Sequence, residues 1–92
     1  MKGQEARCEV TILNELGLHA RPAAEFVRHA NVFRSEIWLI TKAGRFSALS
    51  LIDVMRANLD CGAAATLEAE GPDAEEAVQK LARVVREMRD YE

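Results

Sequence analysis

Residues 6–12 and 65–70 alternate between apolar and polar side chains, and this alternation limits the possible fold more than any other feature. The apolar positions are Ala6, Cys8, Val10 and Ile12 in the first segment and Ala65, Leu67 and Ala69 in the second. A period of two places alternate side chains on opposite faces of a β-strand. Both segments are therefore predicted to be strands with one buried face, which other elements must cover.

Two segments with helical periodicity can provide that cover. In residues 20–31 an apolar stripe is formed by Ala23, Phe26, Val27 and Ala30. Pro22 stands in the first turn, where no intrahelical carbonyl needs its missing N–H. Near the C-terminus a second stripe is formed by Ala77, Val78, Leu81, Val84, Val85 and Met88, opposite a polar face of Glu75, Lys80, Arg83 and Glu87. Both helices are expected to pack on the sheet.

The segment Gly71-Pro72-Asp73 separates the second alternating strand from the last helix. Glycine and proline end regular structure, and aspartate is a common helix N-cap. We expect Asp73 to cap the last helix, with Glu76 reaching back.

The middle of the chain is predicted to be a hairpin followed by a short helix. Residues 36–41 favour a strand, residues 42–44 (Lys-Ala-Gly) are typical of a turn, and residues 45–48 form the return strand. Ser50 followed by Asp53 resembles a capping box, in which the hydroxyl accepts from an amide while the carboxylate reaches back. This pattern predicts a helix from about Leu51 to Ala57.

The element order is therefore βαββαβα. A chain of 92 residues supports one core, so residues 1–92 are expected to form a single domain. Strands with one apolar face indicate an α+β open-faced sandwich: a four-stranded antiparallel sheet with three helices on one face. Trp38 and Ile40 are out of phase with Ile37 and Leu39, which puts them on the uncovered face. Shielding by long neighbouring side chains is favoured there over a dimer contact.

Composition excludes several classes of protein. No apolar run approaches the roughly 20 residues of a membrane helix, and the first ten residues lack the apolar core of a secretory signal, so we expect a cytoplasmic protein. A formal net charge of −3 argues against a nucleic-acid partner. Cys8 and Cys61 are too few for a disulfide framework and lack the spacing of a zinc site. We expect two buried or half-buried thiols and no metal.

The run Gly17-Leu18-His19-Ala20-Arg21-Pro22-Ala23-Ala24 carries the most chemical information. His19 immediately precedes the first helix, and a neutral imidazole nitrogen can attack phosphorus without a strong base. The backbone N–H groups of Ala20 and Arg21 at the helix start can receive phosphoryl oxygens, and the Arg21 guanidinium adds a charged contact. Gly17 can supply a positive backbone dihedral beside the histidine. This arrangement needs no cofactor.

Spacing alone also fits a simpler interpretation, in which His19 is a side chain near a helix cap and Arg21 is a solvated residue of the first turn. His29 is a useful comparison because it lies inside the predicted helix, where no backbone amides are available to hold an anion. We interpret His29 as a surface histidine.

At this point the chain resembles the histidine-containing phosphocarrier (HPr) family of the phosphoenolpyruvate-dependent sugar phosphotransferase system. The motif GLHARPAA carries the resemblance, which extends over nearly the whole chain and includes the distance from His19 to Ser50. The resemblance implies phosphorylation of His19 on Nδ1 by Enzyme I and onward transfer to enzyme IIA domains. It also implies that Arg21 neutralises the phosphoryl group, and that the protein is a carrier that catalyses no reaction alone.

Ser50 falls where many family members carry a regulatory serine that an HPr kinase/phosphorylase phosphorylates. The helix-cap interpretation of Ser50 stands beside this role. Phosphate at a helix start is electrostatically tolerated. Asp53, however, opposes added negative charge one turn away.

The segment after Ser50 departs from the common family pattern, and Leu51, Ile52 and Met55 provide an apolar patch there. With the small Ala20 and Ala24, these residues are candidates for docking partner proteins. Asp53 adds a negative charge to this surface, so the sequence does not determine the identity of the partner proteins. The alternative function is a regulatory HPr-like module, nitrogen-type or phosphorylated on Ser50, that acts by binding proteins. We expect a monomer.

Overall fold

The computed structural model describes residues 4–89, and its elements follow the predicted order. The strands are β1 (Gln4–Thr11), β2 (Glu36–Thr41), β3 (Gly44–Ser47) and β4 (Ala64–Gly71). The helices are α1 (Ala20–Ala30), α2 (Leu51–Arg56) and α3 (Ala74–Glu87). The predicted α+β open-faced sandwich is confirmed. No helix within residues 4–89 is long and apolar enough to cross a bilayer.

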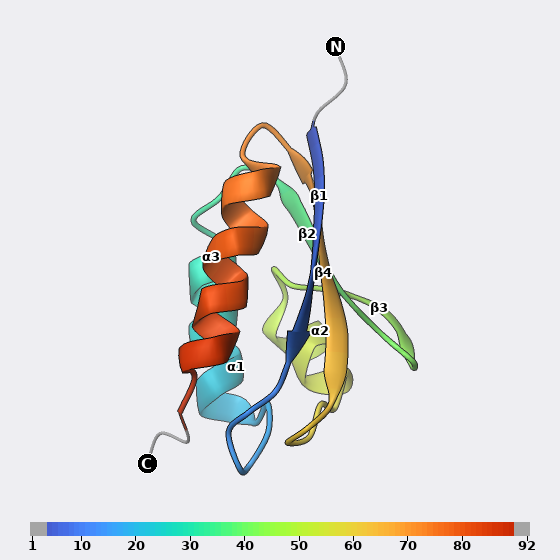
Figure 1. Cartoon of the computed structure of the whole chain (residues 1–92), viewed down its shortest axis with the longest axis vertical. Helices are drawn as coiled ribbons and strands as arrows, with labels where there is room; N and C mark the ends of the chain where they lie inside the picture. The colour runs from blue at the N-terminus through green and yellow to red at the C-terminus, as the bar shows by residue number, and fades with distance from the viewer. Residues whose placement is uncertain (1–3, 90–92) are drawn as a thin grey trace.

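The four strands form one antiparallel sheet in the order β1-β4-β2-β3. The two alternating segments are direct neighbours, with Cys8 opposite Leu67 and Ala6 opposite Ala69. Their apolar sides therefore coincide on one face of the sheet, and α1 and α3 lie together over that face (Figure 1). The alternation in the sequence thus determines which face the helices cover.

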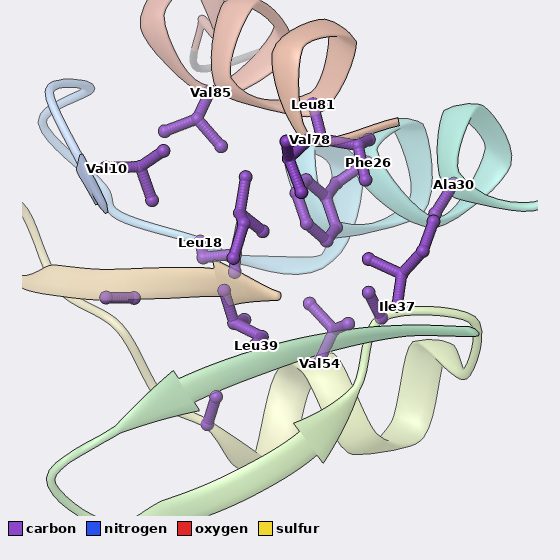
Figure 2. Close-up of a cluster of buried hydrophobic side chains, with 14 of the residues drawn as sticks. Val10, Leu18, Phe26, Ala30, Ile37, Leu39, Val54, Val78, Leu81 and Val85 are labelled. Atoms are coloured by element: carbon purple, nitrogen blue, oxygen red, sulfur yellow. The ribbon is translucent and has the colours of Figure 1, made fainter. Parts of the chain in front are cut away.

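The core lies between this face and the helices. Figure 2 shows Phe26 of α1 and Val78 and Leu81 of α3 pointing toward Ile37 and Leu39 of β2. These side chains are at most 1 % exposed. Val54 of α2 is also fully buried, so the short helix belongs to the same core. Burial of this kind stabilises a fold by roughly 1.5–3 kcal/mol for each large side chain.

Two expectations about polar groups need correction. Asp73 precedes α3, but its carboxylate makes no cap hydrogen bond with that helix. It accepts instead from the Ser35 hydroxyl (2.6 Å) and from the Arg34 backbone N–H (3.0 Å), because the α1–β2 loop passes beside the start of α3. Cys8 is half-buried as expected, whereas Cys61 is exposed because it lies in the turn before β4.

Trp38 and Ile40 lie on the uncovered face of the sheet, as predicted, and both are partly exposed. The guanidinium carbon of Arg45 stands 4.3 Å from the centre of the Trp38 ring. Arg45 also pairs with Glu68 (3.2 Å), which pairs with Arg7 (3.4 Å). A long neighbouring side chain therefore shields Trp38, which agrees with the favoured interpretation.

Candidate functional site

His19 is the N-cap residue of α1, in extended backbone conformation immediately before the helix. The residue is partly exposed as a whole, and its Nε2 atom is buried. The loop between β1 and α1 delivers it to this position. The site is therefore at the surface, at the mouth of an 11-residue helix.

A second loop, between α2 and β4, fixes the loop that carries His19. The Leu18 N–H donates to the Leu59 carbonyl (2.8 Å), and the Gly62 N–H donates to the Ile12 carbonyl (2.7 Å). Gly17 has a φ of +73°, and a Cβ placed there would lie 2.6 Å from the Leu59 oxygen. The role of Gly17 predicted from the sequence is confirmed, and close approach to Leu59 is a second reason for glycine.

Asn14 is a supporting residue that the sequence reasoning missed. Its side chain is buried, and its Nδ2 donates to the Gly17 carbonyl at 2.6 Å. The same carbonyl accepts from the His19 backbone N–H at 2.9 Å. Asparagine commonly bonds to nearby backbone in turns, which was the available signal, but the sequence could not show which carbonyl it would reach.

The first turn of α1 is suited to hold an anion. Ala23 donates to the His19 carbonyl (2.8 Å), which is the first bond of the helix, and Pro22 has no N–H. The N–H groups of Ala20 and Arg21 therefore have no intrahelical acceptor. Residues 20–23 include no acidic side chain, so the positive end of the helix dipole is not neutralised within that turn.

Arg21 adds an exposed positive charge to this turn. Its side chain is exposed, and it lies close enough to Glu25 to contribute to a lowered pKa of that carboxyl, although hydrogen bonding with Arg28 is the largest cause. Arg28 holds Glu25 through a 2.7 Å contact. The guanidinium of Arg21 is thus available beside the helix start.

His29 lies in the last turn of α1, at the opposite end of the helix from His19, and its environment is different. Its Nε2 is 3.9 Å from a carboxylate oxygen of Glu25, and 28 % of its side chain is exposed. It lies within the helix, where the backbone amides are used by the helix itself. The two histidines therefore differ in their access to backbone N–H donors.

The predicted docking residues are exposed and lie on two helices in contact. Ala20 and Ala24 face solvent on α1. The side chains on α2 are 39 % (Leu51), 72 % (Ile52) and 43 % (Met55) exposed. Helix α2 packs against α1. Just before α2, the Leu49 carbonyl accepts from the Asn31 side chain at the end of α1. After α2, the Leu59 carbonyl accepts from the Leu18 N–H.

Ser50 is the N-cap residue of α2, and the Asp53 N–H donates to its hydroxyl at 3.3 Å. The predicted capping box is thus formed on one side. The Asp53 carboxylate reaches farther back than expected and accepts from the Ser47 N–H (3.3 Å). Arg56 lies 3.9 Å from the other carboxylate oxygen. The charge of Asp53 is therefore engaged locally, one turn from the Ser50 hydroxyl.

No group of three or more potential metal ligands occurs among residues 4–89. The chemistry of the site rests on an imidazole, a guanidinium and backbone N–H groups.

Comparisons with known proteins show which family the chain is similar to. The family described as "PTS HPr component phosphorylation site" matches residues 6–87. Phosphocarrier protein HPr of Vibrio cholerae is 39 % identical over 80 residues, which cover 87 % of this chain and 94 % of that protein. A crystal structure of HPr from Bacillus anthracis superposes with a TM-score of 0.84 at 36 % identity, covering 88 % of this chain and 96 % of the other.

An HPr-like protein with a different name, Crh, is as similar to this chain as the HPr proteins are. The HPr-like protein Crh of Bacillus subtilis is 39 % identical over 79 residues, which cover 86 % of this chain and 93 % of that protein. A crystal structure of Crh, described as a catabolite repression protein and as a dimer with a swapping domain, superposes with a TM-score of 0.73. That superposition covers 84 % of this chain and 88 % of the other.

Proposed function

The chain belongs to the PTS HPr family, and on that premise we propose that it is a phosphocarrier that accepts a phosphoryl group on His19 from phosphorylated Enzyme I and donates it to an enzyme IIA domain. The observation that carries this proposal is the start of α1. There a partly exposed histidine adjoins two N–H groups without an intrahelical acceptor and an exposed arginine. A dianionic group attached to His19 would meet all three.

In the proposed transfer, the lone pair on Nδ1 of His19 attacks the phosphorus of the donor. The bond between phosphorus and the donor breaks as the new phosphorus–nitrogen bond forms, and the electron pair leaves with the donor. The N–H groups of Ala20 and Arg21, with the Arg21 guanidinium, stabilise the phosphoryl oxygens. Onward transfer is the same step with His19 as the leaving group.

A carrier must hold its phosphoryl group only moderately, because a group bound too tightly could not be donated. The site meets this requirement through exposure. The Arg21 side chain is exposed, so solvent and salt weaken its attraction for the phosphoryl group. The chain therefore acts as substrate and donor for its partners and catalyses no reaction alone.

We place the partner surface on the exposed side chains of Ala20, Ala24, Leu51, Ile52 and Met55. The small residues on α1 allow close approach to His19, and the larger ones on α2 supply apolar contact. One copy contains a complete site, so the relay requires only the monomer. It operates in the cytoplasm, where both partners would meet the carrier.

Labelling with phosphoenolpyruvate and Enzyme I tests the carrier function. The wild-type chain should acquire an acid-labile, base-stable phosphate and pass it to an enzyme IIA domain. His19→Ala should take up none, whereas His29→Ala should be labelled like the wild type. Equal labelling of His19→Ala and the wild type would refute the proposal.

A regulatory module is the second candidate function, favoured by the similarity to Crh, a catabolite repression protein. In this role an HPr kinase/phosphorylase would phosphorylate Ser50, whose hydroxyl is partly exposed at the start of α2. The added charge of about −1.5 to −2 would change the docking surface beside it. ATP-dependent labelling that disappears in Ser50→Ala, together with no transfer through His19, would favour this function.

A further inference from the structure

The ladder between β2 and β4 stops before either strand ends. Its last pair is Ile40 opposite Thr66. Strand β2 continues to Thr41 and pairs there with β3, whereas β4 begins at Ala64 and pairs there with β1. The sheet that the structure describes is therefore divided at this end. Figure 1 shows the β2–β3 turn projecting away from β4.

Ala64 directs a backbone donor and a backbone acceptor toward this gap. The Ile12 N–H donates to the Ala63 carbonyl (2.9 Å), which continues the register that places Thr11 opposite Ala64. Hydrogen-bonded pairs recur at every second residue of an antiparallel ladder, so the N–H and C=O groups of Ala64 point away from β1 and toward β2. Within residues 4–89, the ladder with β2 places no residue opposite Ala64. Both backbone groups are therefore available to a ligand.

A pocket of about 460 Å³ lies in this gap. Its walls come from the β2–β3 turn, from the residues that follow α2 and from the start of β4, and they include Thr41, Lys42, Ala57, Leu59, Ala63 and Ala64. Sites for small molecules commonly have volumes of roughly 300–1,000 Å³. The pocket is therefore large enough for a small organic molecule.

The walls of the pocket combine apolar surface with a single charge. Ala57 and Leu59 are buried, and Ala63 is partly buried. Lys42 is the sole charged residue among those that line the pocket. It is exposed in the turn between β2 and β3, and no ion pair with it occurs within residues 4–89. The positive charge of Lys42 is therefore uncompensated at the pocket.

We propose that this pocket binds a small organic carboxylate that has an apolar body. The carboxylate accepts from the Lys42 ammonium and from the Ala64 N–H, and the apolar body lies against Ala57, Leu59 and Ala63. The charge of Lys42 selects an anion. The apolar walls disfavour a fully hydrated anion such as inorganic phosphate, which would lose water there without replacing its hydrogen bonds.

The pocket is separate from the start of α1. Neither His19 nor Arg21 lines it. Leu59 lies between the two sites, because it lines the pocket and its carbonyl accepts from the Leu18 N–H (2.8 Å). An anion at the start of α1 would contact the backbone N–H groups of Ala20 and Arg21 instead of Ala64. The two sites can therefore be distinguished by the amides that respond to a ligand, and the pocket does not depend on the phosphoryl chemistry of His19.

Titration of the ¹⁵N-labelled chain with 4-phenylbutyrate tests the site by nuclear magnetic resonance. The amides of Lys42 and Ala64 should shift saturably, with a dissociation constant on the order of 1 mM for a ligand of this size. The neutral 4-phenylbutyramide and acetate, which lacks the apolar body, should each bind at least about three-fold more weakly. Absence of a saturable shift, or a shift confined to the Ala20 and Arg21 amides, would overturn the proposal.

Substitution of Lys42 tests the role of its charge. Lys42→Gln should weaken binding of 4-phenylbutyrate at least about three-fold and leave binding of 4-phenylbutyramide unchanged, whereas Lys42→Arg should retain the affinity. Lys80→Gln is the matched control, because it removes the charge of a lysine on α3 that does not line the pocket. Circular dichroism verifies that each variant is folded. Equal weakening in Lys42→Gln and Lys80→Gln would trace the effect to net charge and overturn the assignment of Lys42.

Discussion

Helices α1 and α2 begin in opposite ways. At the start of α2 the Ser50 hydroxyl accepts from the Asp53 N–H, and the Asp53 carboxylate adds negative charge to the first turn. At the start of α1 the N-cap residue His19 makes no side-chain cap hydrogen bond, and residues 20–23 contain no acid. One start is completed by side chains of the chain itself, and the other can be completed by a bound anion. The first arrangement contributes to stability, and in the proposed function the second would hold the phosphoryl group.

The largest effect is expected from charge reversal in the first turn of α1. Arg21→Glu removes the guanidinium and places a carboxylate beside the phosphoryl group, so transfer from Enzyme I should slow at least ten-fold. The stability should fall by only about 0.3–1 kcal/mol, the value of a charge at an exposed helix end. Rapid-quench kinetics and thermal unfolding measure the two quantities.

Arg28→Glu is the matched control for Arg21→Glu. It reverses a charge on the same helix and loses the ion pair with Glu25, but it lies far along the helix from His19. Its transfer rate should stay within about two-fold of the wild type. A loss of transfer that is equal in both variants would contradict a specific role for Arg21.

The next effect concerns the loop that presents His19. Gly17→Ala adds a Cβ at a positive φ and 2.6 Å from the Leu59 oxygen, so the backbone must shift. We expect a loss of about 1–3 kcal/mol in unfolding free energy, together with slower phosphorylation of His19. Urea denaturation and the labelling assay report these changes.

Gly62→Ala separates backbone strain from the steric clash. Gly62 also has a positive φ (+89°), but nothing lies within 4 Å of a Cβ placed there. This variant should lose less stability than Gly17→Ala and should keep the wild-type transfer rate. Equal losses in the two variants would show that the contact with Leu59 is unimportant.

A smaller effect is expected at the start of α2. Ser50→Ala removes the hydroxyl that accepts from Asp53, which should cost about 1 kcal/mol of stability. Transfer through His19 should be unchanged. Ser50 caps the first turn of α2, whereas the loop that carries His19 is held by Leu59, beyond the last turn of α2. A transfer defect as large as that of Arg21→Glu would show that the two helix starts are not separate in function.

The smallest effect is a loss of stability at acid pH. It concerns Asp73, which lies at neither of the two helix starts compared above. Hydrogen bonds from the Ser35 hydroxyl and then the Arg34 N–H hold the pKa of the Asp73 carboxyl below its usual value. The ionised carboxylate therefore stabilises the fold above the unfolded-state pKa of about 4, and this contribution disappears as the pH falls through the lower folded-state pKa. Asp73→Asn should flatten the dependence of unfolding free energy on pH below 4. An unchanged slope would contradict this assignment.

Local pattern was sufficient to predict most of the fold. Strict alternation in residues 6–12 and 65–70 predicted two strands, and the sheet pairs them with each other. The Ser50 cap was predictable because its partner, Asp53, is three residues away. Such features depend on neighbours in sequence, which periodicity and capping preferences describe well.

Contacts between distant segments could not be predicted in this way. Asp73 bonds with Ser35, 38 residues earlier, instead of capping α3. Leu59 holds Leu18 through backbone atoms, which carry no signal of residue type. Both the support of the His19 loop and the exposure of Cys61 follow from how loops meet in the folded chain. The candidate histidine, His19, could be selected from the sequence, whereas the residues that support its loop required the structure.

Nuclear magnetic resonance of the ¹⁵N-labelled chain, before and after phosphorylation by Enzyme I, tests the central claim most directly. If the start of α1 is completed by the phosphoryl group, the amide protons of Ala20 and Arg21 should shift downfield on phosphorylation, because they gain a charged acceptor. The amide of Asp53 at the start of α2 should barely move. Phosphorylation of His19 without a shift of the Ala20 and Arg21 amides would contradict the account.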